Sequence, residues 1–589
     1  MRTDPRVDPA DPTPRHRIGR RSTYDKHPSV PAGSPSDVTV GWDAIASSLS
    51  GVRTVVLETY PGVLGTDELV RRLDPDLVVD AGSLLLSEPE VRRLTEPFVG
   101  DDPVFGYMTS LRLSDLVDGA ALQRAREAVR DAPGRVLVHG TGASLAAPGA
   151  PVVYAGLPRW EATQRQRRGE ADNLGVHNPD DTPGERYKRA FFVDWRVADR
   201  HRRTIWDRIT HYLDTTHPDR PKMIDSRVWY EALARTAHRP FRVVPYFDPA
   251  PWGGHWMQEV CDVGRGQANL GWCFDCVPEE NSLLLGFGAE TVEVPSIDLV
   301  FREPKALLGE AVWGRFGEEF PIRFDFLDTM GGGNLSLQVH PLTSYIQREF
   351  GMHYTQDESY YLLDAEPDAT VYLGLREGVD RDEMVADLRR AQDEPGWTFP
   401  DDRYVNRFPA RRHDHFLIPA GTVHCSGAGS MVLEISATPY IFTFKLWDWD
   451  RLGLDGRPRP IHIDHGEPNI LVERDTGYAR TRLLNQVRTV ASGPGWTEER
   501  TGLHPAEFIE TRRHWFTGPA PHTVDGVAVL NLVDGEAAVV ESPEGGFEPF
   551  EVHHAETFIV PAGAGPFSVR PVEPGRLHAT VRATVRAGH

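Results

Sequence analysis

Cysteine is scarce in this sequence: among 589 residues there are four, Cys261, Cys273, Cys276 and Cys425. Four thiols in so long a chain exclude a disulfide-built secreted scaffold and predict a reducing, cytoplasmic setting. Cys273 and Cys276 have the spacing of a redox or zinc motif, but they stand in an apolar, strand-like run without a second pair. We interpret them as buried structural thiols.

Positive charge is also scarce, because 64 Lys and Arg face 86 Asp and Glu, for a formal net charge of −22. Nucleic acids and anionic membranes both need clustered positive charge, so we expect neither as a partner. A small anionic ligand needs only a local basic pocket. No apolar run approaches the roughly 20 residues that span a bilayer, and the N-terminus lacks the apolar core of a signal peptide. We therefore expect a soluble, cytoplasmic protein.

What the sequence has is material for several cores: 40% hydrophobic residues, 14 Trp and 25 Phe. A chain of this length predicts two to four domains. Residues 1–37 are poor in apolar side chains and rich in Pro, so we predict a disordered tail. Over residues 38–240 short apolar runs alternate with helical patterns, which predicts an α/β domain with a parallel sheet.

One turn in the predicted α/β domain invites comparison with nucleotide kinases. The stretch VLVHGTGASL (136–145) reads as a strand, a Gly-bearing turn and a helix start, but it has no Gly-Lys-Ser/Thr. We interpret 38–240 as a degenerate nucleotide-kinase-like domain that serves docking or regulation. A basic run at 188–203 is compatible with a phosphate site or with a solvated helix face paired to acidic neighbours.

After residue 240 the texture changes to short apolar runs separated by Gly, Pro, Asn and Asp, which is typical of antiparallel sandwiches or barrels. One helical insert, RDEMVADLRRAQDE, interrupts the pattern. The segments HFLIPAGTVH and TFIVPAGAGPF share a Pro-Ala-Gly turn, and the second has lost the histidine. We predict two β-barrels, 241–470 with metal ligands and 471–589 without them.

Ligand-type residues gather in the first predicted barrel. Side chains at alternate positions of a strand share a face, so Ser336, Gln338 and His340 point one way. Glu358 follows in QDESYY and His424 after the IPAGTV turn. Zinc accepts imidazole nitrogen and carboxylate oxygen. On pattern alone, a metal site and a set of hydrogen-bonded structural residues are both open.

The order and spacing of five motifs resemble the type I phosphomannose isomerases over about residues 240–589. The motifs are WGG (252–254), LSLQVHP (335–341), DESYYLLDA (357–365), HFLIPAGTVHCSGAGSMVLEIS (415–436) and FKLWDWDRLGLDGRPRPIHI (444–463). The resemblance implies a double cupin fold and one Zn²⁺ held by Gln338, His340, Glu358 and His424. The family interconverts mannose 6-phosphate and fructose 6-phosphate through a cis-enediol, by moving a proton between C1 and C2.

The chain departs from the family where phosphate and catalysis are concerned. The family's lysine, about a dozen residues before the Q-x-H, falls in IRFDFLDT, where Asp325 is nearest and Arg323 is the closest cation. The family's phosphate-contacting hydroxyl is kept as Ser336. The family's arginine, about ten residues after the glutamate of VLE (Glu434), is replaced by Lys445, one residue out of step. Lysine lacks the planar fork of arginine. We predict substrate contacts from Ser336 and Arg323, and catalytic roles for Lys445 and Glu434.

Two further residues complete the predicted site. His353 lies close enough to Glu358 in sequence to enter the pocket, as a general base or as a structural residue. Tyr360 and Tyr361 alternate on their strand, so one faces the sugar and the other the core; Tyr360 is our candidate for the sugar.

The leading hypothesis is a zinc-dependent aldose–ketose isomerase whose partner is a small sugar or sugar phosphate. One alternative is a cupin that binds or senses a sugar without turnover. Another is a bifunctional kinase and isomerase, in which the N-terminal half phosphorylates the sugar. The sequence leaves the oligomeric state open.

Overall fold

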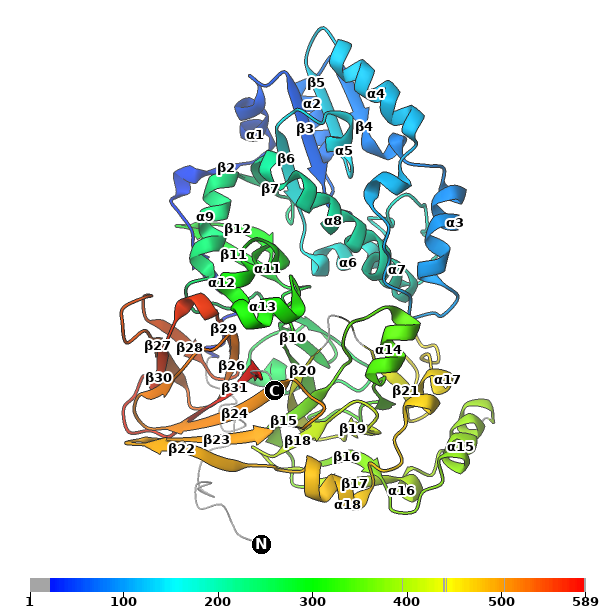
Figure 1. Ribbon diagram of the computed structural model, residues 1–589, viewed down its shortest axis with the longest axis vertical. Helices are drawn as coiled ribbons and strands as arrows, with labels where there is room; N and C mark the ends of the chain where they lie inside the picture. Colours follow the sequence, from blue (N-terminus) through cyan, green and yellow to red (C-terminus); the bar gives the residue numbers. More distant parts are fainter. Residues whose placement is uncertain (1–21, 395, 438–439, 441, 503, 587–589) are drawn as a thin grey trace.

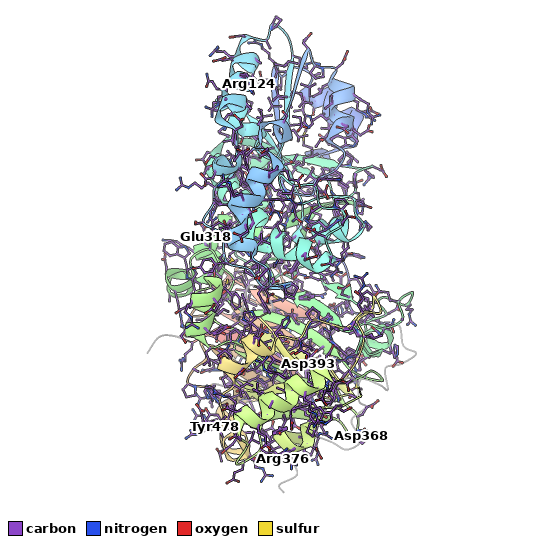
Figure 2. The ribbon with its side chains drawn as sticks, turned by 90° about the vertical axis from the view of Figure 1, so that its right-hand side faces the viewer. Arg124, Glu318, Asp368, Arg376, Asp393 and Tyr478 are labelled. Atoms are coloured by element: carbon purple, nitrogen blue, oxygen red, sulfur yellow. The ribbon has the colours of Figure 1, made fainter. Side chains whose placement is uncertain are left out.

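The computed structural model describes residues 22–394, 396–437, 440, 442–502 and 504–586. Figure 1 shows an elongated molecule, with an α/β part at one end of the long axis and the remaining β-sheets at the other. In the side-chain view of Figure 2, Arg124 marks the first end, and Arg376 and Tyr478 lie at the second. The chain is multidomain, and its described residues form six sheets with helices between them.

A seven-stranded sheet organises the α/β part, in the order β2-β8-β7-β6-β3-β5-β4. Its strands are β2 (Val38–Val40), β3 (Thr54–Thr59), β4 (Leu77–Asp80), β5 (Val136–Gly140), β6 (Val152–Gly156), β7 (Ile209–Asp214) and β8 (Lys222–Asp225). The five strands from β7 to β4 run parallel. β8 pairs antiparallel with β7, and β2 pairs antiparallel with β8. Because parallel neighbours need crossover connections, the alternation of strand and helix in the sequence produces this sheet.

Helices connect and cover these strands (Figure 1). They are α1 (Trp42–Leu49), α2 (Thr66–Leu73), α3 (Glu88–Val99), α4 (Gly119–Asp131), α5 (Ala143–Ala146), α6 (Arg159–Arg167), α7 (Pro183–Arg189), α8 (Trp195–Ile205) and α9 (Ser226–Thr236). In Figure 1, α6, α7 and α8 lie on the side of the α/β part that faces the other sheets. These helices therefore bring the α/β part to the rest of the molecule.

The Gly-bearing turn after β5 is occupied by a carboxylate of the protein itself. The backbone amides of Gly142 and Ser144 donate to the Glu58 carboxylate at 2.6 and 2.8 Å. In a phosphate-binding loop, amides of this kind face the ligand. The degenerate kinase-like nature of this part stays a prediction, and the turn that would bind phosphate in a working kinase is filled by Glu58.

The predicted disordered tail is wrong for residues 22–37. β1 (Ser29–Pro31) pairs in parallel with β11 (Ser282–Phe287). Tyr24 is 6% exposed, and its hydroxyl donates to Asp275 at 2.5 Å. A low average hydrophobicity concealed these anchoring residues, whose partners lie about 250 residues away in sequence. Residues 1–21, the rest of the predicted tail, lie outside the described residues.

Two antiparallel sheets, here called the first barrel, follow in the chain. The six-stranded sheet has the order β18-β15-β20-β13-β10-β9 and the five-stranded sheet β17-β16-β19-β14-β21. Their strands are β9 (Tyr246–Asp248), β10 (Trp272–Cys276), β13 (Arg323–Asp328), β14 (Leu337–Val339), β15 (Glu358–Ala365), β16 (Thr370–Leu375), β17 (Val405–Pro409), β18 (His415–Ile418), β19 (His424–Ser426), β20 (Ser430–Ser436) and β21 (Phe444–Trp447). The predicted helical insert forms α15 (Arg381–Asp393).

The second barrel is again a pair of antiparallel sheets, with the orders β22-β23-β24-β31-β26-β29 and β25-β30-β27-β28. Its strands are β22 (Arg488–Gly493), β23 (Trp496–Gly502), β24 (Ile509–Phe516), β25 (Ala520–His522), β26 (Ala528–Asp534), β27 (Ala537–Glu541), β28 (Phe550–His553), β29 (Thr557–Val560), β30 (Phe567–Pro571) and β31 (His578–Val585). Its strand order repeats that of the first barrel, as the shared Pro-Ala-Gly turn predicts.

A small insertion lies between the α/β part and the barrels (Figure 1). β11 forms a three-stranded sheet with β1 and β12 (Glu290–Pro295). The helices α11 (Ile297–Arg302), α12 (Pro304–Leu308) and α13 (Glu310–Phe316) follow. The remaining helices are α10 (Trp256–Val260), α14 (Thr343–Phe350), α16 (Asp401–Tyr404), α17 (Ile463–Gly466) and α18 (Thr476–Tyr478). Among the described residues, no helix is long and apolar enough to cross a membrane.

Candidate metal centre

Three buried side chains of metal-ligand type, His340, Glu358 and His424, meet inside the first barrel. The Nε2 atom of His340 lies 3.0 Å from Oε2 of Glu358, and Nε2 of His424 lies 2.9 Å from Oε1. The side-chain amide of Gln338 lies 3.2 Å from Nε2 of His424. The structure thus brings together the four residues that the sequence predicts to bind a metal.

Strand pairing produces this convergence. Gln338 in β14 is the register partner of His424, the first residue of β19. Glu358 opens β15 in the other sheet, where it pairs with Ile418 of β18. The carboxylate of one sheet therefore meets the imidazole groups of the other. Ser336 and Gln338 line one cavity, as their alternate positions predict.

Both imidazole rings use Nδ1 on the backbone, at 2.8 Å from the carbonyl oxygens of Phe442 and Thr422. A carbonyl oxygen only accepts, so Nδ1 carries a proton, and Nε2 of each ring is the atom that faces Glu358, where it can hold a proton or a cation. Two lone pairs and a carboxylate that converge repel one another unless a proton or a cation lies between them. Backbone bonds of this kind orient metal-binding histidines. The cluster therefore fits a divalent cation such as zinc.

The electrostatics of Glu358 favour the same conclusion. Burial opposes its ionisation, but the neighbouring His340 and His424 hold the pKa of this carboxyl well below its usual range. The Gln356 amide also donates to Oε2 at 3.0 Å. The carboxylate form is the one that coordinates a metal ion.

A cavity of about 280 Å³ opens beside Gln338. It lies between β14 and β21 of one sheet and β9 and β10 of the other, and β21 and β9 are the last strands of their sheets. The cavity therefore forms where the two sheets separate. Its volume is near the lower end of the roughly 300–1,000 Å³ typical of ligand pockets, which suits a small molecule.

Sequence reasoning missed Arg459, which lines this cavity next to Ser336. Its guanidinium lies 2.8 Å from Oδ2 of Asp448, whose Oδ1 accepts from the Ser336 hydroxyl at 2.7 Å. Arg451 also donates to Asp448, at 2.6 Å. Two guanidinium groups around one carboxylate leave a local excess of positive charge. The segment GRPRPIHI offers two arginines as cations for the site, but the sequence does not show which of them points inward.

Lys445 lies on β21 as the register partner of Gln338, and its side chain lines the cavity. Burial, with the nearby Arg459 adding to it, lowers the pKa of Lys445 to about 7. At neutral pH this amine is therefore divided between its charged and neutral forms. Such a group can both accept and donate a proton.

Three predicted site residues lie in the barrel interior and do not line the cavity. Tyr360 is fully buried, with its ring centroid 5.8 Å from that of His424. Arg323 is 1% exposed and lies 3.6 Å from Oδ2 of Asp325. Burial and the charge of Glu358 raise the pKa of Glu434 well above its usual range, which favours its protonated form. The prediction that these three line the cavity is wrong, because their strands turn the side chains into the barrel interior. The candidate metal ligands lie there too, so the substrate and catalytic roles of the three stay predictions.

The prediction that His353 enters the same pocket is also wrong. It is exposed and lines a separate cavity of about 820 Å³ with part of α8. The chain turns outward because α14 ends at Phe350 and Gly351 adopts a left-handed conformation. The interpretation of the basic run 188–203 as a solvated helix face is wrong, because Lys188, Arg189 and Arg202 are buried. Pairing to acidic neighbours is found for Arg202 with Asp298 and for Arg203 with Glu318.

Fold and site define a class of protein in which a β-barrel with a candidate metal centre is joined to an α/β part. Comparison with known proteins finds a similarity for each of these two parts. Residues 41–238 match a family described as "Domain of unknown function (DUF8485)". Part of the chain is similar to mannose-6-phosphate isomerases, which confirms the predicted resemblance.

Two curated relatives illustrate this similarity. Mannose-6-phosphate isomerase ManA of Bacillus subtilis is 29% identical over 147 residues, which are 25% of this chain and 43% of that protein. Mannose-6-phosphate isomerase of Streptococcus mutans is 29% identical over 215 residues, 36% of this chain and 62% of that protein. This chain therefore spans about half the length of the curated relatives. The crystal structure of the Bacillus subtilis mannose 6-phosphate isomerase aligns with a TM-score of 0.48 at 18% identity, over 59% of this chain and all of that one.

Proposed function

We propose that this protein is a zinc-dependent aldose–ketose isomerase that interconverts mannose 6-phosphate and fructose 6-phosphate, or a related sugar, through a cis-enediol. The observation that carries the proposal is the His340–Glu358–His424 cluster, which has Gln338 at the edge of a small cavity. The names of the curated relatives support the substrate class. A sugar phosphate is then the partner, and a cytoplasmic setting stays a prediction.

The proposed zinc ligands are Gln338, His340, Glu358 and His424. A bound zinc ion would act as a Lewis acid that stabilises negative charge on the sugar oxygens. The backbone bonds at Nδ1 hold both imidazole rings in the orientation and tautomer that ligation needs. The two histidines could therefore bind the ion through Nε2 without changing their hydrogen bonds at Nδ1.

The chain's own residues can supply the proton transfer and the grip on the anionic group. We assign the transfer between C1 and C2 to Lys445, whose pKa of about 7 lets it take up a proton near neutral pH and return it. Arg459 and Ser336 form the polar end of the cavity, which would bind the phosphate. A guanidinium group there replaces the cation that the family places before the Q-x-H motif.

The direct test incubates the zinc-loaded full-length protein with mannose 6-phosphate in deuterated water. We expect fructose 6-phosphate to form with solvent hydrogen entering at C1, and chelation to stop the reaction until zinc is returned. Binding of the sugar phosphate without turnover or exchange would select the sugar-sensing alternative. The absence of both binding and turnover would overturn the proposal.

A further inference from the structure

The cavity beside the candidate metal centre is not made by the barrel alone. Helix α6 of the α/β part contributes Trp160, Thr163 and Arg167 to its lining, and α7 contributes Tyr187. These residues belong to the stretch that matches the domain of unknown function, and they share the cavity with Gln338. Part of the wall therefore comes from outside the region that resembles isomerases.

Polar contacts fasten this wall to the barrel. The Glu280 carboxylate accepts from the Tyr187 hydroxyl at 2.6 Å and from the Tyr246 hydroxyl at 3.0 Å. One hydroxyl comes from α7 and the other from β9, so a single carboxylate joins the two parts. Arg167 adds an ion pair with Asp248 at 2.9 Å. Hydrogen bonds to a charged group are stronger than those between neutral groups, so these contacts fix the position of the wall.

Aromatic rings continue across the junction. Trp160 of α6 stacks on Tyr246 with ring centroids 3.7 Å apart and planes 13° from parallel. Tyr246 in turn stacks on Phe274 at 4.7 Å and 23°. Trp272 extends this row, with its ring 13° from the plane of Phe274. Aromatic rings offer rigid apolar area suited to the C–H faces of a pyranose, while the barrel supplies polar groups for its oxygens.

We propose that α6 and α7 complete the sugar site, with Trp160 as a specificity-determining residue that closes the cavity around a single hexose unit bearing an anionic group. The inference rests on the proposed function and deepens it. The anionic group lies at Ser336, Lys445 and Arg459, and the ring packs along the aromatic row. The domain of unknown function is then a component of the binding site.

Size and chemistry both support this assignment. A cavity of about 280 Å³ suits one sugar unit, and the indole of Trp160 forms part of its wall. Removing the indole would take away stacking area and open the cavity end. We therefore expect a hexose phosphate to bind more weakly and the preference for a single sugar unit to relax.

The test measures binding of mannose 6-phosphate to the full-length, zinc-loaded protein by calorimetry. For Trp160→Ala we expect a Kd at least about tenfold higher, and for Trp160→Phe a change below about threefold, because a ring is retained. Trp313→Ala is the matched control, since Trp313 lines the separate cavity and should leave Kd unchanged. In turnover, KM should rise while kcat and its pH profile stay close to wild type, and zinc content should be equal in all variants.

The outcomes separate the inference from the proposed function. An unchanged Kd in Trp160→Ala contradicts the proposal that α6 and α7 complete the sugar site, and it leaves the isomerase proposal unaffected. Binding without turnover in the wild type contradicts the isomerase proposal and leaves the contribution of α6 and α7 to the sugar site unaffected. No binding in the wild type overturns both. Should Trp160→Ala fail to fold, Thr163→Phe fills the cavity from the same helix and must block binding, whereas the isosteric Thr163→Val must not.

Discussion

The two barrels share a scaffold and differ in what they place inside it. Across the six-stranded sheets the order β18-β15-β20-β13-β10-β9 corresponds strand by strand to β29-β26-β31-β24-β23-β22. Likewise β17-β16-β19-β14 corresponds to β28-β27-β30-β25. The first barrel has one strand more, β21, which carries Lys445. The repeat therefore extends to topology, while the catalytic candidate lies on the added strand.

Register shows which residues stand at the ligand positions of the second barrel. Glu358 pairs with Ile418, and Ala528 pairs with Val560; Ile418 and Val560 each precede the Pro-Ala-Gly turn. Ala528 thus takes the place of the glutamate. After the turn the strand begins with Phe567, at the position where β19 begins with His424.

The residues paired with His424 and with Phe567 also differ in their contacts between the two barrels. Gln338 pairs with His424 in the first barrel, and His522 pairs with Phe567 in the second. Phe567 stacks on His522 at 4.6 Å, with planes 2° apart. A buried aromatic contact thus occupies the space that the first barrel gives to the candidate metal centre. The comparison teaches that one scaffold holds either a ligand cluster or an apolar core, and that two or three side chains decide between them.

The largest effect is expected from His424→Phe, which gives the first barrel the side chain that Phe567 supplies at the corresponding position of the second. We expect loss of bound zinc and a fall in turnover of more than about 10⁴-fold, because several kcal/mol of charge stabilisation disappear with the metal. Metal analysis and an isomerase assay measure both. Phe567→Leu, the control in the second barrel, should keep zinc and turnover; full zinc occupancy in His424→Phe would contradict the ligand assignment.

The added strand is tested by Lys445→Met, which keeps the length of the side chain and removes its proton. We expect kcat to fall about 10²-fold, at the low end of what a positioned base contributes, with unchanged zinc content. Because a base acts when deprotonated, the wild-type rate should rise with pH through about 7, and this limb should vanish in the variant. A pH–rate profile with the same limb in Lys445→Met would assign the proton transfer to another group.

The apolar core of the second barrel predicts an effect on stability. Phe567 is 1% exposed, so Phe567→Ala should lower the free energy of unfolding by about 3–5 kcal/mol through cavity formation. Urea unfolding measures this change, and Phe567→Leu should lose less than about 1.5 kcal/mol. Zinc content in the first barrel should not change. A loss of zinc in Phe567→Ala would show that the two barrels are coupled.

The seam between the barrels predicts a dependence of stability on pH. Burial lowers the pKa of His415 to about 4, and its Nδ1 donates to the carbonyl of Thr501 at 2.9 Å. The unfolded chain binds this proton from about pH 6.5 downward, so stability is full above that pH and falls toward pH 4, by roughly 3 kcal/mol. Urea unfolding between pH 7 and 4 should show a flatter profile for His415→Gln. The exposed His27→Gln should match the wild type; an equal slope in all three would exclude His415 as the cause.

Local patterns in the sequence predicted the parts of the site that depend on one strand or one turn. Alternation along LSLQVHP placed Ser336 and Gln338 at one cavity, and the residue types of Glu358 and His424 indicated a metal. The sequence did not predict that Arg323 and Tyr360 are buried away from the cavity, because burial in the interior depends on which strands pack against them. It failed for His353 because the left-handed turn at Gly351 sends that loop outward.

The sequence by itself determined the ligand types, the repeated Pro-Ala-Gly turn and the alternation of strands and helices before residue 240, since each is a short-range property of the chain. Only the tertiary structure decided that Trp160 and Tyr187 share a cavity with Gln338, that burial lowers the pKa of Lys445 to about 7, and that burial raises the pKa of Glu434. These facts depend on burial and on neighbours distant in sequence. A pattern read along one segment contains neither the dielectric environment nor the identity of such neighbours.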